Sequence, residues 1–302
     1  MNQSTPLPPS VLRAYQEPPQ KIEVDGSPTW ILRGAHFVIA LTRAHAGCIL
    51  ERVFQTDEYL LLLPPGVSAK VDADGETLVA NGNSLTIVPP GPSQAVIETA
   101  GEVVRVFSGQ AEDLLALASN AEVYRHMVAA EPEIWPEPHD GFRLRYYDLS
   151  AHGDVNGPLI QPRIYRSANL MLNAFVPFRH ARPTNELRPH WHDDFEQASV
   201  ALSGNWIHHI RTPWGNDLAG WREDEHLEVG SPSIAIIPET LIHATRNFGD
   251  GEAWLLDVFG PPRLDFCLAG LVINGDEYPL PSNRDIELDE RLVPNGWRRS
   301  ST

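Results

Sequence analysis

The first third of the chain alternates short apolar runs with turn residues. Residues 59–63 form one such run, and the turn sequence Pro64-Pro65-Gly66 follows it directly. The pairs Asp74-Gly75 and Asn81-Gly82 mark two further turns. Aliphatic and β-branched runs of this length favour strands, and Asp-Gly and Asn-Gly pairs favour tight hairpins. Regularly spaced short strands are typical of a sandwich or barrel, so we predict an all-β barrel over residues 29–110.

The same rhythm returns in the second half of the chain. Alternating or wholly apolar runs occur at 200–202, 234–237 and 254–259. Such runs, bounded by turn residues, predict a second β-barrel over residues 143–262. The apolar stretch after it is expected to pack back on this barrel, and the whole segment 263–302 ends in a charged tail.

The two β regions are joined by a partly helical connection at residues 111–142. Its first part, 111–130, has the only convincing helical periodicity, with Leu114, Leu115 and Val123 on one side. A Pro-rich stretch at 131–139 ends the predicted helix. Residues 1–28 are predicted to form an N-terminal arm that drapes over a neighbour or stays mobile, because their start is rich in Pro, Gln and Ser.

Composition narrows the functional classes. The 302 residues are 42% hydrophobic and 21% charged, values typical of a folded soluble protein. The net charge of -17 argues against nucleic acid and anionic membranes as partners and favours a small-molecule substrate. No long apolar stretch and no signal-peptide pattern is present, so we expect a cytoplasmic location. Cys48 and Cys267 are too few for a thiolate centre, so any metal must be held by nitrogen and oxygen.

Four side chains form the strongest candidate site. His190 and His192 are two residues apart, and Glu196 has the same parity, so an extended path would place all three on one face. His243 follows 47 residues after Glu196. Imidazole and carboxylate together suit one divalent transition metal per chain, with Fe(II) favoured and Mn, Ni, Zn or Co as alternatives. The sequence therefore predicts a metal site formed by His190, His192, Glu196 and His243.

The order of these residues resembles the cupin superfamily, whose motifs read roughly G-x5-HxH-x3,4-E-x6-G and G-x5-PxG-x2-H-x3-N. The first motif appears here as His190-x-His192-x3-Glu196-x7-Gly204, in which the last spacing is one residue too long. The second appears as Gly230-x7-Pro238-x-Thr240-x2-His243-x3-Asn247, with Thr240 in place of the turn glycine. This resemblance implies a double-stranded β-helix, or jelly-roll, barrel around the metal.

An internal repeat extends the resemblance to the first half. Glu58-x7-Gly66 has the spacing of Glu196-x7-Gly204, and Pro89-x-Gly91-x2-Gln94 matches the segment that ends at His243. The chain therefore resembles a bicupin, with two barrels. The first barrel has Arg52, Phe54 and Gln94 at the histidine positions, so only Glu58 remains as a potential ligand. A lone carboxylate would not hold a transition metal, and we predict that this barrel is metal-free. In its cavity Arg52 and Glu58 could simply pair with each other.

Further polar residues near the motifs are weaker candidates for catalytic or supporting roles. Asp194 could accept a hydrogen bond from a ligand imidazole, although a solvated carboxylate is the alternative. His208 or His209 should face the barrel interior, as an acid or base or as a structural histidine. Arg246 could clamp a substrate carboxylate, or form a surface salt bridge. Five indoles suit either a flat ligand or core and dimer contacts, namely Trp191, Trp206, Trp214, Trp221 and Trp254.

The predicted ligands leave two positions open on a six-coordinate ion, which favours metal-dependent catalysis. Members of the cupin superfamily include dioxygenases and oxalate decarboxylase. The resemblance implies first a dioxygenase that acts on a small phenolic or carboxylic acid. A metal-dependent isomerase or lyase is the alternative, and a non-catalytic ligand-binding cupin is the third. We also expect a homodimer, because cupins commonly pair sheet to sheet.

Overall fold

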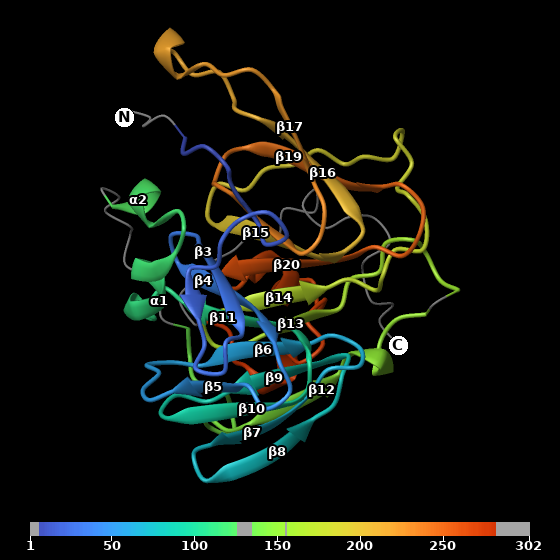
Figure 1. Cartoon of the computed structure of the whole chain (residues 1–302). Helices are drawn as coiled ribbons and strands as arrows, with labels where there is room; N and C mark the ends of the chain where they lie inside the picture. Colours follow the sequence, from blue (N-terminus) through green and yellow to red (C-terminus); the bar gives the residue numbers. More distant parts are fainter. Residues whose placement is uncertain (1–5, 126–134, 155, 282–302) are drawn as a thin grey trace.

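The computed structural model describes residues 6–125, 135–154 and 156–281. The regular secondary structure of the described part consists mainly of antiparallel strands in four sheets, which form two halves (Figure 1). The all-β class predicted from the sequence is thereby confirmed. None of the described helices is long and apolar enough to cross a membrane.

The first half contains a seven-stranded sheet and a four-stranded sheet. The larger sheet has the order β12-β9-β6-β11-β4-β3-β2, with strands Arg145–Asp148, Ser84–Val88, Tyr59–Leu63, Gly101–Ser108, Phe37–Ala44, Pro28–Arg33 and Lys21–Ile22. The smaller sheet has the order β5-β10-β7-β8, with strands Ile49–Arg52, Ser93–Thr99, Ser68–Ala73 and Glu76–Ala80. The turns predicted after Leu63, at Asp74-Gly75 and at Asn81-Gly82 all lie between these strands.

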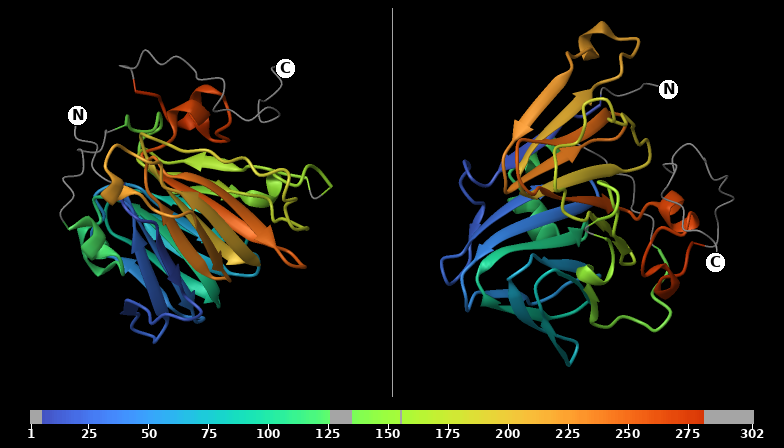
Figure 2. Two further views of the ribbon diagram at one scale, coloured as in Figure 1. Left: turned by 90° about the horizontal axis from the view of Figure 1, so that it is seen from above. Right: turned by 90° about the vertical axis from the view of Figure 1, so that its right-hand side faces the viewer.

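The second half contains a six-stranded sheet and a three-stranded sheet. The larger sheet has the order β1-β18-β15-β20-β14-β13, with strands Ser10–Arg13, Ser233–Ile237, Glu196–Ser203, Trp254–Gly260, Met171–Ala174 and Ile164–Arg166. The smaller sheet has the order β17-β16-β19, with strands Glu225–Val229, Asn205–Arg211 and Ile242–Phe248. The loop between β16 and β17 projects from the rest of the molecule (Figure 2).

Short helices occupy the connections. Two of them, α1 (Glu112–Leu117) and α2 (Ala121–Tyr124), lie in the region where the sequence predicted a longer helix. The end of that predicted helix and the start of the Pro-rich stretch, residues 131–134, lie outside the described residues, as does the tail after residue 281. The remaining helices are η1 (Leu149–Ala151), η2 (Leu218–Gly220), α3 (Leu264–Leu268) and η3 (Gly275–Glu277).

The main hydrophobic core lies between the two larger sheets. Alternate residues of β4 and β6 from the first half pack there against alternate residues of β15 and β20 from the second half. The intervening residues of β4 and β6 face the interior of the first half instead. Because successive side chains of a strand point to opposite faces, each larger sheet has one face toward the other half and one toward its own smaller sheet.

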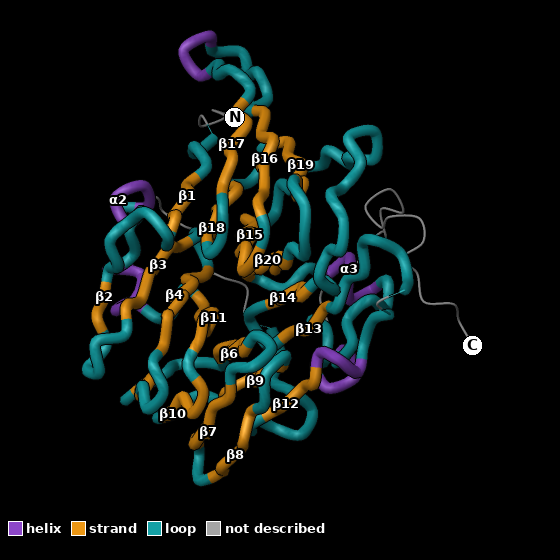
Figure 3. Tube along the Cα trace, turned by 45° about the vertical axis from the view of Figure 1, so that its right-hand side comes forward, coloured by secondary structure: helices purple, strands orange, loops and turns teal. Residues whose placement is uncertain are grey.

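Two strands pair with the half that is distant from them in the sequence. The predicted arm contains β1, which pairs with β18 of the second half, and Leu12 is fully buried there (Figure 3). Conversely, β12 follows the connection but pairs with β9 of the first half. The backbone groups of an unpaired edge strand need partners, and these two exchanges supply them within the chain. The arm is therefore an integral strand of the fold over Ser10–Arg13, not a loose segment.

Candidate metal centre

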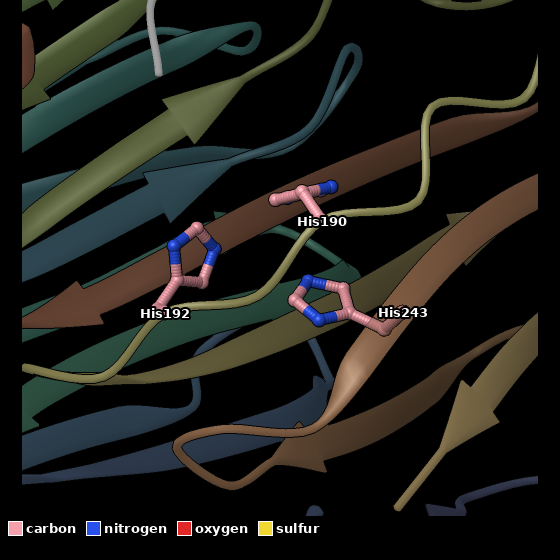
Figure 4. A group of neighbouring side chains, drawn as sticks. All are labelled: His190, His192 and His243. Atoms are coloured by element: carbon pink, nitrogen blue, oxygen red, sulfur yellow. The ribbon is translucent and has the colours of Figure 1, made fainter. Parts of the chain in front are cut away.

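Three of the four predicted ligands come together in the second half. His190 and His192 lie in the extended segment before β15, and His243 is the second residue of β19 (Figure 4). His190 and His243 exchange backbone hydrogen bonds, with N–O distances of 3.1 and 2.8 Å. One ligand nitrogen from each of His190, His192 and His243 lies within 4.8 Å of the others. Backbone pairing thus fixes two segments that are distant in sequence around one point.

The orientation of the imidazoles leaves nitrogen lone pairs free to bind a cation. The Nδ1 atoms of His190 and His243 lie 3.0 Å from the carbonyl oxygens of Arg188 and Leu241, so Nδ1 carries the proton in both rings. The Nε2 atoms of His192 and His243 are buried and have no hydrogen-bond partner. A buried polar atom without a partner is costly, and metal-binding histidines commonly donate their other ring nitrogen to a carbonyl. The three residues therefore fit a divalent metal.

The electrostatic surroundings keep these rings neutral. Burial lowers the pKa of His243 to about 3, with a further contribution from His190. Burial also lowers the pKa of His192 strongly, and the nearby guanidinium of Arg263 adds to the effect. Only neutral imidazole binds a metal ion, so proton competition is weak at neutral pH.

Glu196 does not belong to this group. Its carboxylate accepts hydrogen bonds from the backbone N–H of Ala35 and from the hydroxyl of Tyr124, at 3.1 Å from Oε1 in the second case. Both partners belong to the first half of the molecule. The expectation that Glu196 is the fourth ligand therefore disagrees with the structure. The reason is strand parity: Glu196 shares its face of β15 with Ala198 and Val200, which pack in the core between the halves.

Glu58 has the same role on the other side of this core. Its carboxylate accepts hydrogen bonds from the backbone N–H of Ala168 and the hydroxyl of Tyr278, both at 2.9 Å, and both partners come from the second half. The guanidinium of Arg145 lies 3.6 Å away. The internal repeat of Glu58 and Glu196 seen in the sequence is thus a real structural repeat, but it connects the two halves and does not repeat a metal ligand.

The partners of the two glutamates are supported in the same way. Asn120 binds both backbone groups of Arg33, at 3.0 and 2.8 Å, and so holds the turn that presents Ala35. Asn274 binds both backbone groups of Arg166, at 3.0 and 2.9 Å, and so holds the turn that presents Ala168. Each asparagine precedes the tyrosine of its contact by four residues. The structural repeat therefore includes three parts in each half: the glutamate, the turn that donates a backbone N–H to it, and the short helix that ends at or directly before the tyrosine.

In the first half, the residues that the sequence aligned with the three histidines do not gather around one point. Arg52 forms two hydrogen bonds to Asp113, at 2.6 and 3.0 Å, and not an ion pair with Glu58. Phe54 is 70% exposed. Ser93, and not Gln94, is the residue opposite Arg52 in the pairing of β10 with β5, as His243 is opposite His190. The sequence match was one residue out of register at this strand.

The candidates for supporting roles separate by position. Asp194 is exposed, and the ring Nδ1 atoms of His190 and His243 have backbone carbonyls, not Asp194, as their acceptors. His208 is buried with Nδ1 2.9 Å from the hydroxyl of Thr245, and burial lowers its pKa to about 4. Arg246 is on the opposite face of β19 from His243 and donates to the carbonyl of Arg182 at 2.8 Å. It cannot clamp a substrate at the histidines.

The indoles do not line this site as a group. Trp206 and Trp254 are buried in the core. Trp191, Trp214 and Trp221 are exposed. Trp214 and Trp221 stack on each other in the projecting loop between β16 and β17.

Sequence reasoning missed three residues around the histidines. Gln197 is buried on the face of β15 opposite to Glu196, and it is paired across the sheet with Phe259, whose ring centroid lies 6.4 Å from that of His192. Asp257 of β20 accepts a hydrogen bond from Ser199 at 2.8 Å, and burial raises its pKa to about 6. Arg263 is buried and forms two hydrogen bonds to Asp265. The sequence does contain a signal for Gln197. The cupin motif has six residues between its glutamate and the following glycine, and six residues separate Gln197 from Gly204, whereas seven separate Glu196 from it.

Solved structures of oxalate decarboxylase have a similar fold. A single-residue mutant of the Bacillus subtilis enzyme has a TM-score of 0.58 and 13% identity, covering 89% of this chain and 82% of that chain. The formate complex of the Lactobacillus farciminis enzyme has a TM-score of 0.56 and 14% identity, covering 89% of this chain and 92% of that chain. No family model and no curated protein matches the chain. The likeness shows a cupin-type jelly-roll fold, as the motifs predicted.

Proposed function

We propose that this protein is a bicupin enzyme whose second half binds one divalent metal ion through His190, His192 and His243. The observation that carries the proposal is the convergence of three ligand nitrogens, two of them buried without a hydrogen-bond partner. We assign residues 29–110 and 143–262 to the two cupin units. Two strands depart from this assignment: β1 lies before the first unit and pairs with β18 of the second, and β12 lies in the second unit and pairs with β9 of the first.

We infer that the reaction is an isomerisation or a lyase reaction on a small carboxylic acid or other anionic oxygen donor. A bound divalent ion would supply Lewis-acid polarisation of a substrate oxygen. Arg263 is paired with Asp265, but it still lowers the pKa of His192 and His243, and this positive potential at the histidines favours an anionic substrate. Asp257 and Ser199 form a hydrogen-bonded pair on the face of the sheet that carries Gln197, where a carboxylate can hold a proton.

The dioxygenase expected first from the ligand types finds no support in the solved structures named above, because these are oxalate decarboxylases. Fe(II) loses its priority for the same reason, since Lewis-acid chemistry is open to Mn, Ni, Zn and Co as well. A homodimer remains our expectation for the assembly, and its test is the mass of the purified protein in solution.

Elemental analysis of the purified protein, with turnover assays on small carboxylic acids in air and under nitrogen, tests the proposal. We expect about one metal ion per chain and turnover that continues without oxygen. His192→Ala and His243→Ala should lose both, whereas His226→Ala is a matched control, because His226 is an exposed histidine of the same half. Turnover that requires oxygen would return the assignment to a dioxygenase, and a wild-type protein that binds no metal would refute the metal centre.

A further inference from the structure

The fourth position of the metal centre is best filled by a residue on the interior face of β15. Glu196, Ala198 and Val200 face the core between the two halves. The opposite face carries Gln197, Ser199 and Ala201, and Ala201 packs against residues of the smaller sheet of the second half. Gln197 is 4% exposed, and it is paired across the sheet with Phe259 of β20, whose ring centroid lies 6.4 Å from that of His192. It is therefore the residue of β15 that combines interior orientation with a place beside the histidine group.

The hydrogen bonds of Gln197 fix which end of its amide faces the histidines. Its Nε2 lies 3.3 Å from the hydroxyl oxygen of Ser199, and that hydroxyl donates to Asp257. The hydroxyl of Ser199 gives its single proton to Asp257, so its oxygen accepts from Gln197, and the NH₂ end of the amide points to Ser199. Asp257 thus orients the amide through Ser199. The carbonyl oxygen is then left for the side of His192.

The first half provides a comparison that lacks metal-binding groups at the same positions. Tyr59 follows Glu58 as Gln197 follows Glu196, so it faces the interior of its own half. Its hydroxyl lies 3.2 Å from that of Ser93, the residue opposite Arg52. The two halves therefore share the glutamate contact and differ at the next residue, where only the half with three histidines has an amide oxygen to offer.

We propose that Gln197 is the fourth protein donor of the metal centre, with Glu196 holding the two halves together. The proposal rests on the proposed function, because it requires a metal at the three histidines. A set of three imidazoles and one amide carries no charge, so the ion keeps its full positive charge for the substrate. Such a centre should bind anionic oxygen donors more readily than one with a glutamate ligand. Asp257 then acts as a positioning residue, because it orients the amide.

Cobalt(II) titration of the metal-free, full-length protein tests this assignment. Visible absorption reports the ligand set, and competition with a chromogenic chelator gives the dissociation constant. Gln197→Ala should weaken cobalt binding by at least the roughly 10- to 100-fold that the loss of an outer-shell partner costs, and it should change the visible spectrum because a donor atom is lost. Gln197→Glu should tighten binding by about 10-fold or more, because it adds a negative charge. Glu196→Gln is the matched control at the neighbouring residue, with binding within about twofold of wild type and an unchanged spectrum.

The outcomes separate this inference from the proposed function. If wild type binds no cobalt, the metal centre itself is refuted. If wild type binds cobalt, His243→Ala loses it, and both Gln197 variants match wild type, the centre stands and the role of Gln197 is overturned. Weakened binding in Glu196→Gln alone would also overturn it. A crystal structure of the metal-loaded protein gives the direct answer: we expect Oε1 of Gln197 about 2.0–2.3 Å from the ion, and a distance beyond about 3 Å contradicts the proposal.

Discussion

Replacing Glu196 by Gln should remove a pH dependence from the stability of the protein. Burial raises the pKa of Glu196 to about 7, although Ala35 and Tyr124 donate to its carboxylate. The native state therefore holds a proton on this group that the unfolded chain releases nearer pH 4.5. Glutamine reproduces the protonated form, because its oxygen can accept from Ala35 while its NH₂ group donates to the hydroxyl oxygen of Tyr124.

The sign follows from proton linkage. Between the two pKa values the native state binds more protons at Glu196 than the unfolded state, so the stability of the wild type falls as pH rises. A shift from 4.5 to about 7 corresponds to about 3 kcal/mol. The free energy of unfolding of wild type minus that of Glu196→Gln should thus fall by about 3 kcal/mol between pH 4.5 and pH 8.

Urea denaturation at several pH values, with a chelator present to remove any metal, measures this difference. Other titrating groups cancel because the two proteins are compared at the same pH. Glu252→Gln, at an exposed glutamate, controls for the change in net charge and should show a nearly constant difference. If the difference for Glu196→Gln also varies by less than about 1 kcal/mol across the range, Glu196 is ionised throughout and the reasoning is refuted.

Three further variants or conditions test the fold and the site. Leu256→Ala, in the core between the larger sheets, should lower the free energy of unfolding by about 2–5 kcal/mol in urea denaturation, and a loss below about 1 kcal/mol would contradict the assigned packing. Gly34→Ala places a Cβ atom 2.7 Å from Oε2 of Glu196 and 2.8 Å from the ring of Phe37, so we expect a loss of about 1–3 kcal/mol by the same method. Saturating divalent metal, at about 100 times its dissociation constant, should stabilise wild type by about 2.7 kcal/mol in thermal unfolding, and equal stabilisation of His243→Ala would place the metal elsewhere.

The sequence determined the class of the fold and most of its site, because both depend on local patterns. Apolar runs with Asp-Gly and Asn-Gly turns predict strands from the backbone preferences of single residues. The spacing His190-x-His192 and the order of the two motifs gave three histidines that the structure brings together. The repeat of Glu58 and Glu196 was visible as well, since both residues make the same kind of contact.

The tertiary structure alone decided the parts that depend on register and on distant pairing. A shift of one residue along a strand moves a side chain to the other face, and this separates Glu196 from Gln197 and Gln94 from Ser93. The pairing of β1 with β18 and of β12 with β9 joins segments that are far apart in the chain. Local pattern carries no information on such partners, because the backbone groups of an edge strand accept any strand that the rest of the fold brings beside them.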